Sequence, residues 1–232
     1  MNHELQIKAT DNSGTFSAFI AYPEMDPAPV VIVIQEIFGV NKNLRDLCLK
    51  LADEGYIAVC PDLFWRQQPG IQLTDQTEAE WKRAFELYNG FNVDKGIEDL
   101  KATLAQVRTL PEGTGKVGTV GYCLGGKLAY LMATRSDADC NIAYYGVGIQ
   151  DLLGESGNIK KPLLMHIAEK DGFVPPEAQQ KITAGLKDNK LVTMYTYPGM
   201  DHAFTRIGGK NYNKEAAEQA WDRTEEFLAK NL

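Results

Sequence analysis

The sequence is poor in the residues that build disulfide frameworks and zinc sites. It contains four cysteines and three histidines in 232 residues. The cysteines are scattered and form no C-x-x-C pair, which fits a reducing cytoplasm better than a disulfide framework. No pair of histidines has metal-ligand spacing, so we expect no zinc site and no other cofactor. The four positions are Cys48, Cys60, Cys123 and Cys140.

Long apolar runs and an excess of positive charge are also missing. No stretch approaches the roughly 20 apolar residues that a membrane helix needs. The start, Met1-Asn2-His3-Glu4, has neither the basic segment nor the apolar segment of a signal peptide. A formal net charge of -7 argues against nucleic acid or an anionic membrane as partners. We therefore expect a cytoplasmic protein that acts on a small molecule, and separately we expect a monomer.

What the chain does contain is an alternation of strand-like and helical patterns. The first two strand-like runs alternate in polarity and predict an antiparallel edge, whereas the later ones are continuously apolar and predict parallel strands covered on both faces. This order indicates a single α/β domain over residues 1–232, with a mostly parallel, doubly wound sheet of about eight strands and helices on both faces. The expected strands are 6–10, 15–22, 30–35, 57–60, 116–121, 141–145, 163–168 and 191–197, and the expected helices are 43–54, 77–89, 93–108, 126–135, 176–188 and 214–228.

The segment Gly121-Tyr122-Cys123-Leu124-Gly125-Gly126 stands between an expected strand and an expected helix. It is the G-x-S-x-G pattern with cysteine in the serine position. In that pattern a sharp turn lifts one side chain to the edge of the sheet, beside the start of a helix. A lone cysteine is usually a small buried hydrophobe, and we accept that interpretation for Cys48 and Cys140. The glycine frame makes Cys123 the candidate nucleophile.

Two phosphate-loop patterns overlap the same region. Gly121-x-x-x-x-Gly126-Lys127 resembles a P-loop, but Leu128 follows where Mg²⁺ binding needs Ser or Thr. The run Gly113-x-Gly115-x-x-Gly118 matches the dinucleotide fingerprint, but it precedes a strand instead of following one. Neither context favours a nucleotide-binding protein, and an ATP-binding measurement would separate that alternative.

A thiol nucleophile needs a base, and the base needs an orienting acid. In α/β-hydrolases the order along the chain is nucleophile, acid, base. His202 follows the last expected strand, at a strand end where α/β sheets place catalytic groups, whereas His166 lies inside a strand and is expected in the core. Asp171 follows the preceding strand in a turn and is the candidate acid. Asp201 is a poor alternative because adjacent side chains point apart.

A carboxylate follows the expected strand 30–35, in the segment Gln35-Glu36-Ile37-Phe38-Gly39. This is the position of the loop that supplies one N–H of the oxyanion hole in an α/β-hydrolase. We expect the backbone N–H groups of Ile37 and Leu124 to form that hole. Glu36 would then lie close enough to the nucleophile to exchange a proton with it.

Several blocks together resemble the dienelactone hydrolase (carboxymethylenebutenolidase) family, and they extend from about residue 29 to 206. The resemblance implies a single-domain α/β-hydrolase without a large lid. It also implies hydrolysis of a cyclic enol ester to maleylacetate during chlorocatechol degradation. The blocks are Gln35-Glu36-Ile37-Phe38-Gly39-Val40-Asn41, Cys60-Pro61-Asp62-Leu63, Gly121-Tyr122-Cys123-Leu124-Gly125-Gly126, Tyr144-Tyr145-Gly146 and Gly199-x-x-His202-x-Phe204.

Carried onto matching positions, the resemblance implies Cys123 as nucleophile, His202 as base and Asp171 as the orienting acid. Glu36 would hold the resting thiol neutral and take its proton when substrate arrives, which protects the thiol from oxidation. Arg206 would bind the substrate carboxylate, because a guanidinium fork suits a carboxylate.

One departure concerns the substrate. The family's second arginine and a nearby tyrosine correspond here to Trp81 and Phe85. Lys82 and Arg83 are close, but they face other directions on a helix, about 100° per residue away. We expect weaker carboxylate binding or a preference for a more apolar ester, so a broader carboxylesterase is the alternative function. A non-catalytic binding protein is disfavoured because it needs no base.

Overall fold

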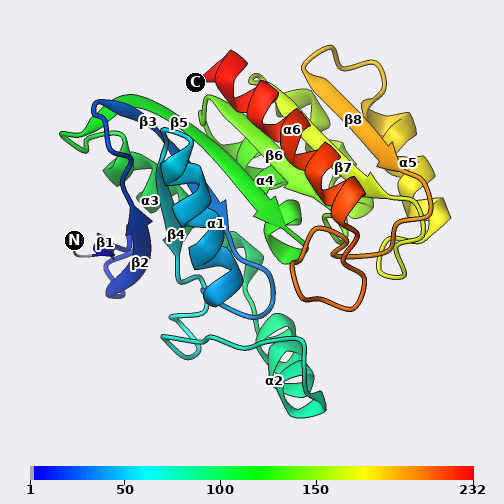
Figure 1. The fold of residues 1–232 in the computed structure, drawn as a ribbon, viewed down its shortest axis with the longest axis horizontal. Helices are drawn as coiled ribbons and strands as arrows, with labels where there is room; N and C mark the ends of the chain where they lie inside the picture. Colours follow the sequence, from blue (N-terminus) through cyan, green and yellow to red (C-terminus); the bar gives the residue numbers. More distant parts are fainter. Residues whose placement is uncertain (1–2) are drawn as a thin grey trace. The chain divides into compact units, whose positions relative to one another are not determined.

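The computed structural model describes residues 3–232 (Figure 1), so the part of the signal-peptide prediction that concerns Met1 and Asn2 lies outside the described residues. The described chain contains an eight-stranded, mostly parallel sheet. It divides into two compact units at Thr119. No helix within residues 3–232 is both long and apolar enough to cross a membrane.

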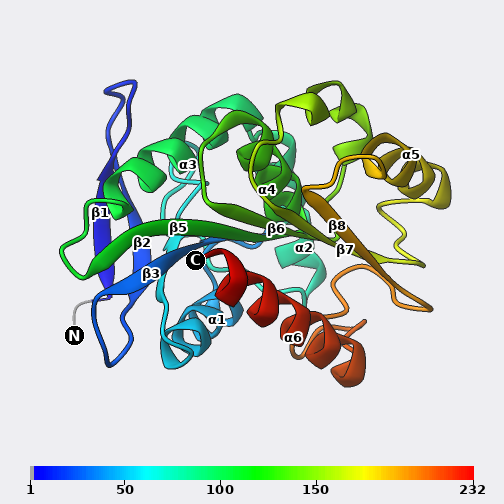
Figure 2. The same ribbon diagram turned by 90° about the horizontal axis from the view of Figure 1, so that it is seen from above.

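The first unit pairs its strands in the order β1-β2-β4-β3. The β1–β2 and β2–β4 pairs are antiparallel and the β3–β4 pair is parallel, which confirms the predicted antiparallel edge. In register, Phe19 lies opposite Cys60, and Val31 lies beside Ala58. Helices α1 and α3 lie on opposite faces of these strands (Figure 2). The elements are β1 (Glu4–Lys8), β2 (Thr15–Ala21), β3 (Ala28–Ile34), α1 (Lys42–Asp53), β4 (Ile57–Pro61), α2 (Glu78–Asn89) and α3 (Val93–Val107).

The second unit is entered along β5 (Gly113–Tyr122). Its strands β6, β7 and β8 are parallel, with Tyr144 beside His166 and His166 beside Tyr195. Helix α6 covers one face of these strands, and α4 and α5 lie on the other (Figure 2). The elements are α4 (Leu124–Arg135), β6 (Cys140–Tyr144), η1 (Ile149–Asp151), η2 (Leu153–Asn158), β7 (Leu163–Ala168), α5 (Pro176–Leu186), β8 (Val192–Tyr197) and α6 (Lys214–Asn231).

The predicted α/β architecture is confirmed, and its boundaries differ locally. The helix expected from residue 126 begins at Leu124, directly after the candidate nucleophile. The short 3-10 helices η1 and η2 were not predicted, because runs this short carry little periodic signal. The glycines from Gly113 to Gly118 lie within β5, which is the wrong place for a dinucleotide loop. The single domain over residues 1–232 stays a prediction.

His166 is a core histidine, as the sequence predicts. Its Nδ1 lies 2.7 Å from the Tyr197 hydroxyl and its Nε2 lies 3.1 Å from Oγ1 of Thr224. The ring also stacks on Tyr144, with 4.1 Å between ring centroids. Burial, aided by the charge of Arg223, lowers the pKa of His166 to about 3, so the ring is neutral at physiological pH. This network joins α6 to β6, β7 and β8 beneath the loops that carry the site.

Candidate active site

Cys123 stands in a strained turn between β5 and α4. Its backbone has φ 56° and ψ -112°, a region that L-residues seldom occupy and that persists only when neighbouring contacts hold it. The Cys123 N–H donates to the carbonyl of Tyr144 at 3.1 Å, and the carbonyl of Cys123 accepts from the N–H of Lys127 at 3.2 Å. The thiol is therefore presented at the carboxyl end of a strand and the start of a helix.

At two positions of the predicted elbow, only glycine fits, because neighbouring backbone atoms leave no room for a side chain. A Cβ atom on Gly121 would lie 1.9 Å from the carbonyl oxygen of Gly125, and one on Gly126 would lie 2.4 Å from the carbonyl oxygen of Tyr144. Backbone atoms stand at both points and cannot swing aside. The glycines of the motif thus let α4 pack against its own turn and against β6, and that packing aims Cys123.

The base and the acid meet at the ends of neighbouring strands. Nδ1 of His202, in the loop after β8, lies 2.8 Å from Oδ2 of Asp171, in the turn after β7. Both side chains are buried. The other carboxylate oxygen, Oδ1, accepts the backbone N–H groups of Phe173 at 2.8 Å and Val174 at 3.2 Å. Asp171 is therefore oriented by its own turn and presents one oxygen to the imidazole.

The imidazole of His202 also forms a hydrogen bond with the thiol of Cys123. Burial alone would lower the pKa of His202, but the charge of Cys123 and the hydrogen bonds to Asp171 and Cys123 outweigh burial and raise this pKa to about 10. At neutral pH the ring of His202 is thus an imidazolium. Cys123 and His202 together place a sulfur nucleophile beside a proton donor.

Two aromatic rings enclose this imidazole, and sequence reasoning assigned neither of them to the site. Tyr145, just after β6, meets His202 edge-on at 5.1 Å between centroids, and Phe173 meets it edge-on at 4.8 Å. The hydroxyl of Tyr145 lies 2.7 Å from Oγ1 of Thr205. Phe173 remains 48% exposed. Their only sequence signals are that Tyr145 belongs to a family block and Phe173 stands two residues after Asp171.

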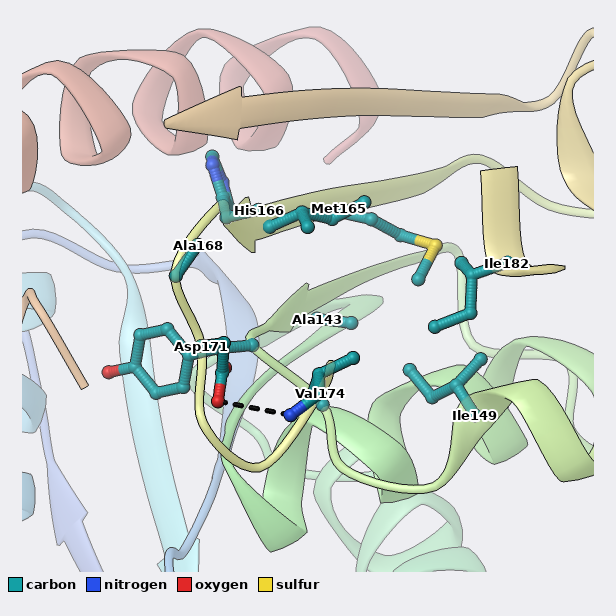
Figure 3. A pocket seen from close by; sticks show the side chains of 11 residues that line it. Ala143, Ile149, Met165, His166, Ala168, Asp171, Val174 and Ile182 are labelled. Atoms are coloured by element: carbon teal, nitrogen blue, oxygen red, sulfur yellow. Dashed lines mark hydrogen bonds between the residues drawn. The ribbon is translucent and has the colours of Figure 1, made fainter. Parts of the chain in front are cut away.

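A small cavity of about 10 Å³ lies beneath the acid loop. Apolar side chains of Ile149, Met165 and Ile182 converge on it, and Asp171 stands at its edge with its bond to Val174 (Figure 3). Ligand pockets usually measure about 300–1,000 Å³, whereas this space suits about one water molecule. It is a packing feature that supports the acid loop, and it is too small for an ester substrate.

Glu36 and Ile37 are buried in the loop that follows β3, in the first unit. The side chain of Gln35 holds this loop: its Oε1 accepts the N–H of Leu63 at 2.9 Å, and its Nε2 donates to the carbonyl of Glu36 at 3.3 Å. Leu124 is the first residue of α4, where helical N–H groups lack partners within the helix. The roles of Glu36, Ile37 and Leu124 toward the thiol stay predictions.

The expected substrate residues of α2 form an aromatic cluster. Trp81 meets Phe38 edge-on at 5.0 Å and stacks on Phe85 at 5.6 Å, and its indole N–H donates to the carbonyl of Asp75 at 3.0 Å. Arg83 instead donates to Glu86 at 2.9 Å and to Gln68 at 2.7 Å. Its guanidinium is therefore engaged by these two polar side chains.

Arg206 lies in the loop after β8, four residues beyond the base. It is half-buried, and its backbone N–H donates to the carbonyl of Ala203 at 3.0 Å. Its role as a carboxylate clamp stays a prediction. Within residues 3–232, no group of three or more His, Cys, Asp and Glu side chains is arranged to hold a metal ion.

Comparison with known proteins places the chain among ester hydrolases of this fold. The model of the dienelactone hydrolase family matches residues 16–232. A protein of Azospirillum brasilense, provisionally named carboxymethylenebutenolidase, is 51% identical over 99% of each chain. The carboxymethylenebutenolidase of Pseudomonas putida is 42% identical, over 93% of this chain and 91% of that one.

Among solved structures, a protein of Klebsiella pneumoniae provisionally named dienelactone hydrolase superposes with a TM-score of 0.83 and 26% identity, over 97% of this chain and 98% of that one. The predicted α/β-hydrolase fold is thereby confirmed. Because a family model covers most of the chain and relatives match it over nearly its whole length, the chain is an ester hydrolase that belongs to the dienelactone hydrolase family.

Proposed function

We propose that the protein opens the enol-lactone ester of dienelactone to maleylacetate through a cysteine acyl-enzyme. One observation carries the proposal: Cys123, in a strained elbow, hydrogen-bonds a histidine that Asp171 orients. Family membership supplies the substrate class, and the triad supplies a nucleophile, a base and an acid in the chain order of α/β-hydrolases.

The first half of the proposed reaction forms the thioester. The thiol of Cys123 loses its proton to Glu36 as substrate arrives. The thiolate attacks the lactone carbonyl carbon, and the backbone N–H groups of Ile37 and Leu124 stabilise the oxyanion. Collapse of the tetrahedral intermediate breaks the ring C–O bond and releases an enolate, which takes the proton of the His202 imidazolium at carbon and becomes the ketone of the product.

The second half removes the acyl group from the enzyme. His202, aligned by Asp171, takes a proton from a water molecule, and the resulting hydroxide adds to the thioester carbonyl. Cleavage of the C–S bond releases maleylacetate. The freed sulfur takes its proton back from Glu36, and His202 is again an imidazolium. Arg206 holds the substrate carboxylate through both halves with its guanidinium fork.

A broader carboxylesterase acting on small activated esters is the second candidate. The observation that favours it is the aromatic cluster of Phe38, Trp81 and Phe85, in which Trp81 and Phe85 stand where the family resemblance leads us to expect an arginine and a tyrosine. Apolar rings favour uncharged substrate groups and give no counter-charge to a carboxylate.

The test compares the purified protein with its Cys123→Ala variant on cis- and trans-dienelactone and on p-nitrophenyl acetate. We expect the variant to lose turnover of all three substrates, while a matched Cys48→Ala variant, at a buried cysteine of α1, keeps its turnover. Full activity of the Cys123→Ala variant would refute the thiol mechanism. Turnover of p-nitrophenyl acetate with neither lactone hydrolysed would select the esterase alternative.

We further propose that the enzyme works as a cytoplasmic monomer on a small-molecule ester, without a cofactor, nucleic acid or membrane partner. The net charge of -7 and the scattered cysteines support this proposal. Sedimentation at micromolar concentration should give a single species of the chain mass, 25.7 kDa. A species of twice that mass would contradict the monomer.

A further inference from the structure

One carboxylate oxygen joins the loop of the acid to the loop of the base. Oδ1 of Asp201 accepts the backbone N–H of His202 at 2.6 Å and the backbone N–H of Gly172 at 3.2 Å. Gly172 directly follows Asp171, so this oxygen lies between the main-chain neighbours of the two residues that must meet. Sequence reasoning set Asp201 aside as an acid, and the structure gives its side chain a different task.

Other contacts between the two loops lie farther from the site. The N–H of Lys170 donates to the carbonyl of Met200 at 2.7 Å, which extends the β7–β8 pairing beyond the strands. Oε2 of Glu169 accepts the N–H of Gly199 at 2.8 Å. These contacts hold the bases of the loops. Among these contacts between the two loops, the one made by Asp201 includes the backbone N–H of His202.

The backbone at His202 needs such support. The carbonyl of His202 accepts the Asn211 side-chain amide at 2.9 Å, so both of its main-chain polar groups are held by side chains. The next residue, Ala203, has φ 61°, in the left-handed region that residues other than glycine rarely adopt. A strained conformation of this kind persists only where surrounding contacts enforce it.

We propose that Asp201 is a positioning residue that sets the distance and angle between His202 and Asp171 by accepting both N–H groups with one side-chain oxygen. This inference rests on the proposed function of these two residues. Asp201 acts through its acceptor geometry, because it lies beside the backbone N–H groups while Asp171 already occupies Nδ1 of the imidazole. Neither its negative charge nor a proton transfer is required.

The test uses three variants of the full chain. Asp201→Ala removes the acceptor, Asp201→Asn keeps an acceptor oxygen without the charge, and Glu169→Ala breaks the loop contact that does not reach His202. For Asp201→Ala we expect kcat on p-nitrophenyl acetate to fall about 10–100-fold with KM little changed, because misplacing a catalytic group by about 1 Å costs this much. Asp201→Asn and Glu169→Ala should keep kcat within about threefold of the parent protein.

A second measurement tests the pairing of Cys123 with His202 without an ester substrate. The rate of alkylation of Cys123 by iodoacetamide, followed by peptide mass spectrometry, reports how strongly the neighbouring His202 activates the sulfur. We expect slower alkylation at neutral pH in Asp201→Ala and near-parent rates in Asp201→Asn. If Asp201→Ala does not fold, Asp201→Ser replaces it, since a hydroxyl is too short to bridge both N–H groups and should show the same losses.

The outcomes separate this inference from the proposed function. Parent-like kcat and alkylation in Asp201→Ala would overturn the inference, as would an Asp201→Asn variant as slow as Asp201→Ala, which would point to charge instead of acceptor geometry. A parent protein that hydrolyses neither lactone would refute the proposed substrate, while the alkylation contrast between the alanine and asparagine variants would still decide the role of Asp201.

Discussion

Nδ1 of His202 lies 2.8 Å from Oδ2 of Asp171, and the two residues stand 31 positions apart in the chain. Parallel pairing of β7 and β8 brings them together, because it places the loops after both strands at the same edge of the sheet. The acid can therefore hold the base in one orientation and leave the other side of its ring for the thiol.

Asp171→Asn should lower kcat by about 10²–10⁴-fold, since an amide can no longer stabilise the imidazolium and favours the wrong tautomer. The fold should survive, because Asn keeps an oxygen that can accept the N–H groups of Phe173 and Val174. Stopped-flow kinetics and a thermal melt check both points. Asp188→Asn, at an exposed position after α5, is the control and should leave kcat unchanged.

The unfolding free energy should depend on the ionisation of His202. Its pKa rises from 6.5 to about 10 on folding, so the native state holds the proton more tightly than the unfolded chain. The resulting stabilisation is complete below pH 6.5 and is lost as the pH rises through about 10. Urea denaturation across this range measures it. A His202→Gln variant should lack this part of the pH dependence, and an unchanged slope in the variant would contradict the prediction.

Gly126→Ala should destabilise the protein by about 1–3 kcal/mol, the range typical of overpacking, and should abolish turnover. The added Cβ would lie 2.4 Å from the carbonyl oxygen of Tyr144, so α4 or β6 must move and the elbow with it. Gly154→Ala is the matched control, because a Cβ there meets nothing within 4 Å. Chemical denaturation gives the free energy of unfolding of both variants. Equal values would contradict the prediction that the backbone beside Gly126 leaves no room for a Cβ atom.

Arg206→Ala should raise KM for dienelactone by about 10–100-fold, the value expected from losing a charge-assisted hydrogen bond. KM for uncharged p-nitrophenyl acetate should change much less. Steady-state kinetics on both substrates gives the comparison. Equal increases for both would refute the carboxylate clamp and show a general loss of structure instead.

Trp81→Arg should shift specificity toward the charged lactone. The variant places a guanidinium where the aromatic ring meets Phe38 and Phe85, so kcat/KM for dienelactone should rise relative to that for p-nitrophenyl acetate. The ratio of the two kcat/KM values is the measurement. Trp81→Leu, which removes the ring without adding charge, is the control and should not raise this ratio.

Much of the fold could be predicted because its signals are local. The continuous apolar run of β7 predicts a buried strand, and the periodic pattern of α1 predicts a helix. Both patterns can be recognised within a few residues. The start of α4 was predicted at residue 126, but the helix begins at Leu124. The strained backbone of Cys123, which sets this start, leaves no signal in residue propensities.

The sequence by itself determined the alternation of strands and helices, the glycine frame around Cys123 and the order of thiol, acid and base, because spacing and residue type express each of these along the chain. Only the tertiary structure decided that Tyr145 and Phe173 enclose His202, that Asp201 spans two loops, and that the pKa of His202 rises. These properties depend on distances between residues far apart in the chain. Such distances are set by strand pairing and loop packing, which no local pattern encodes.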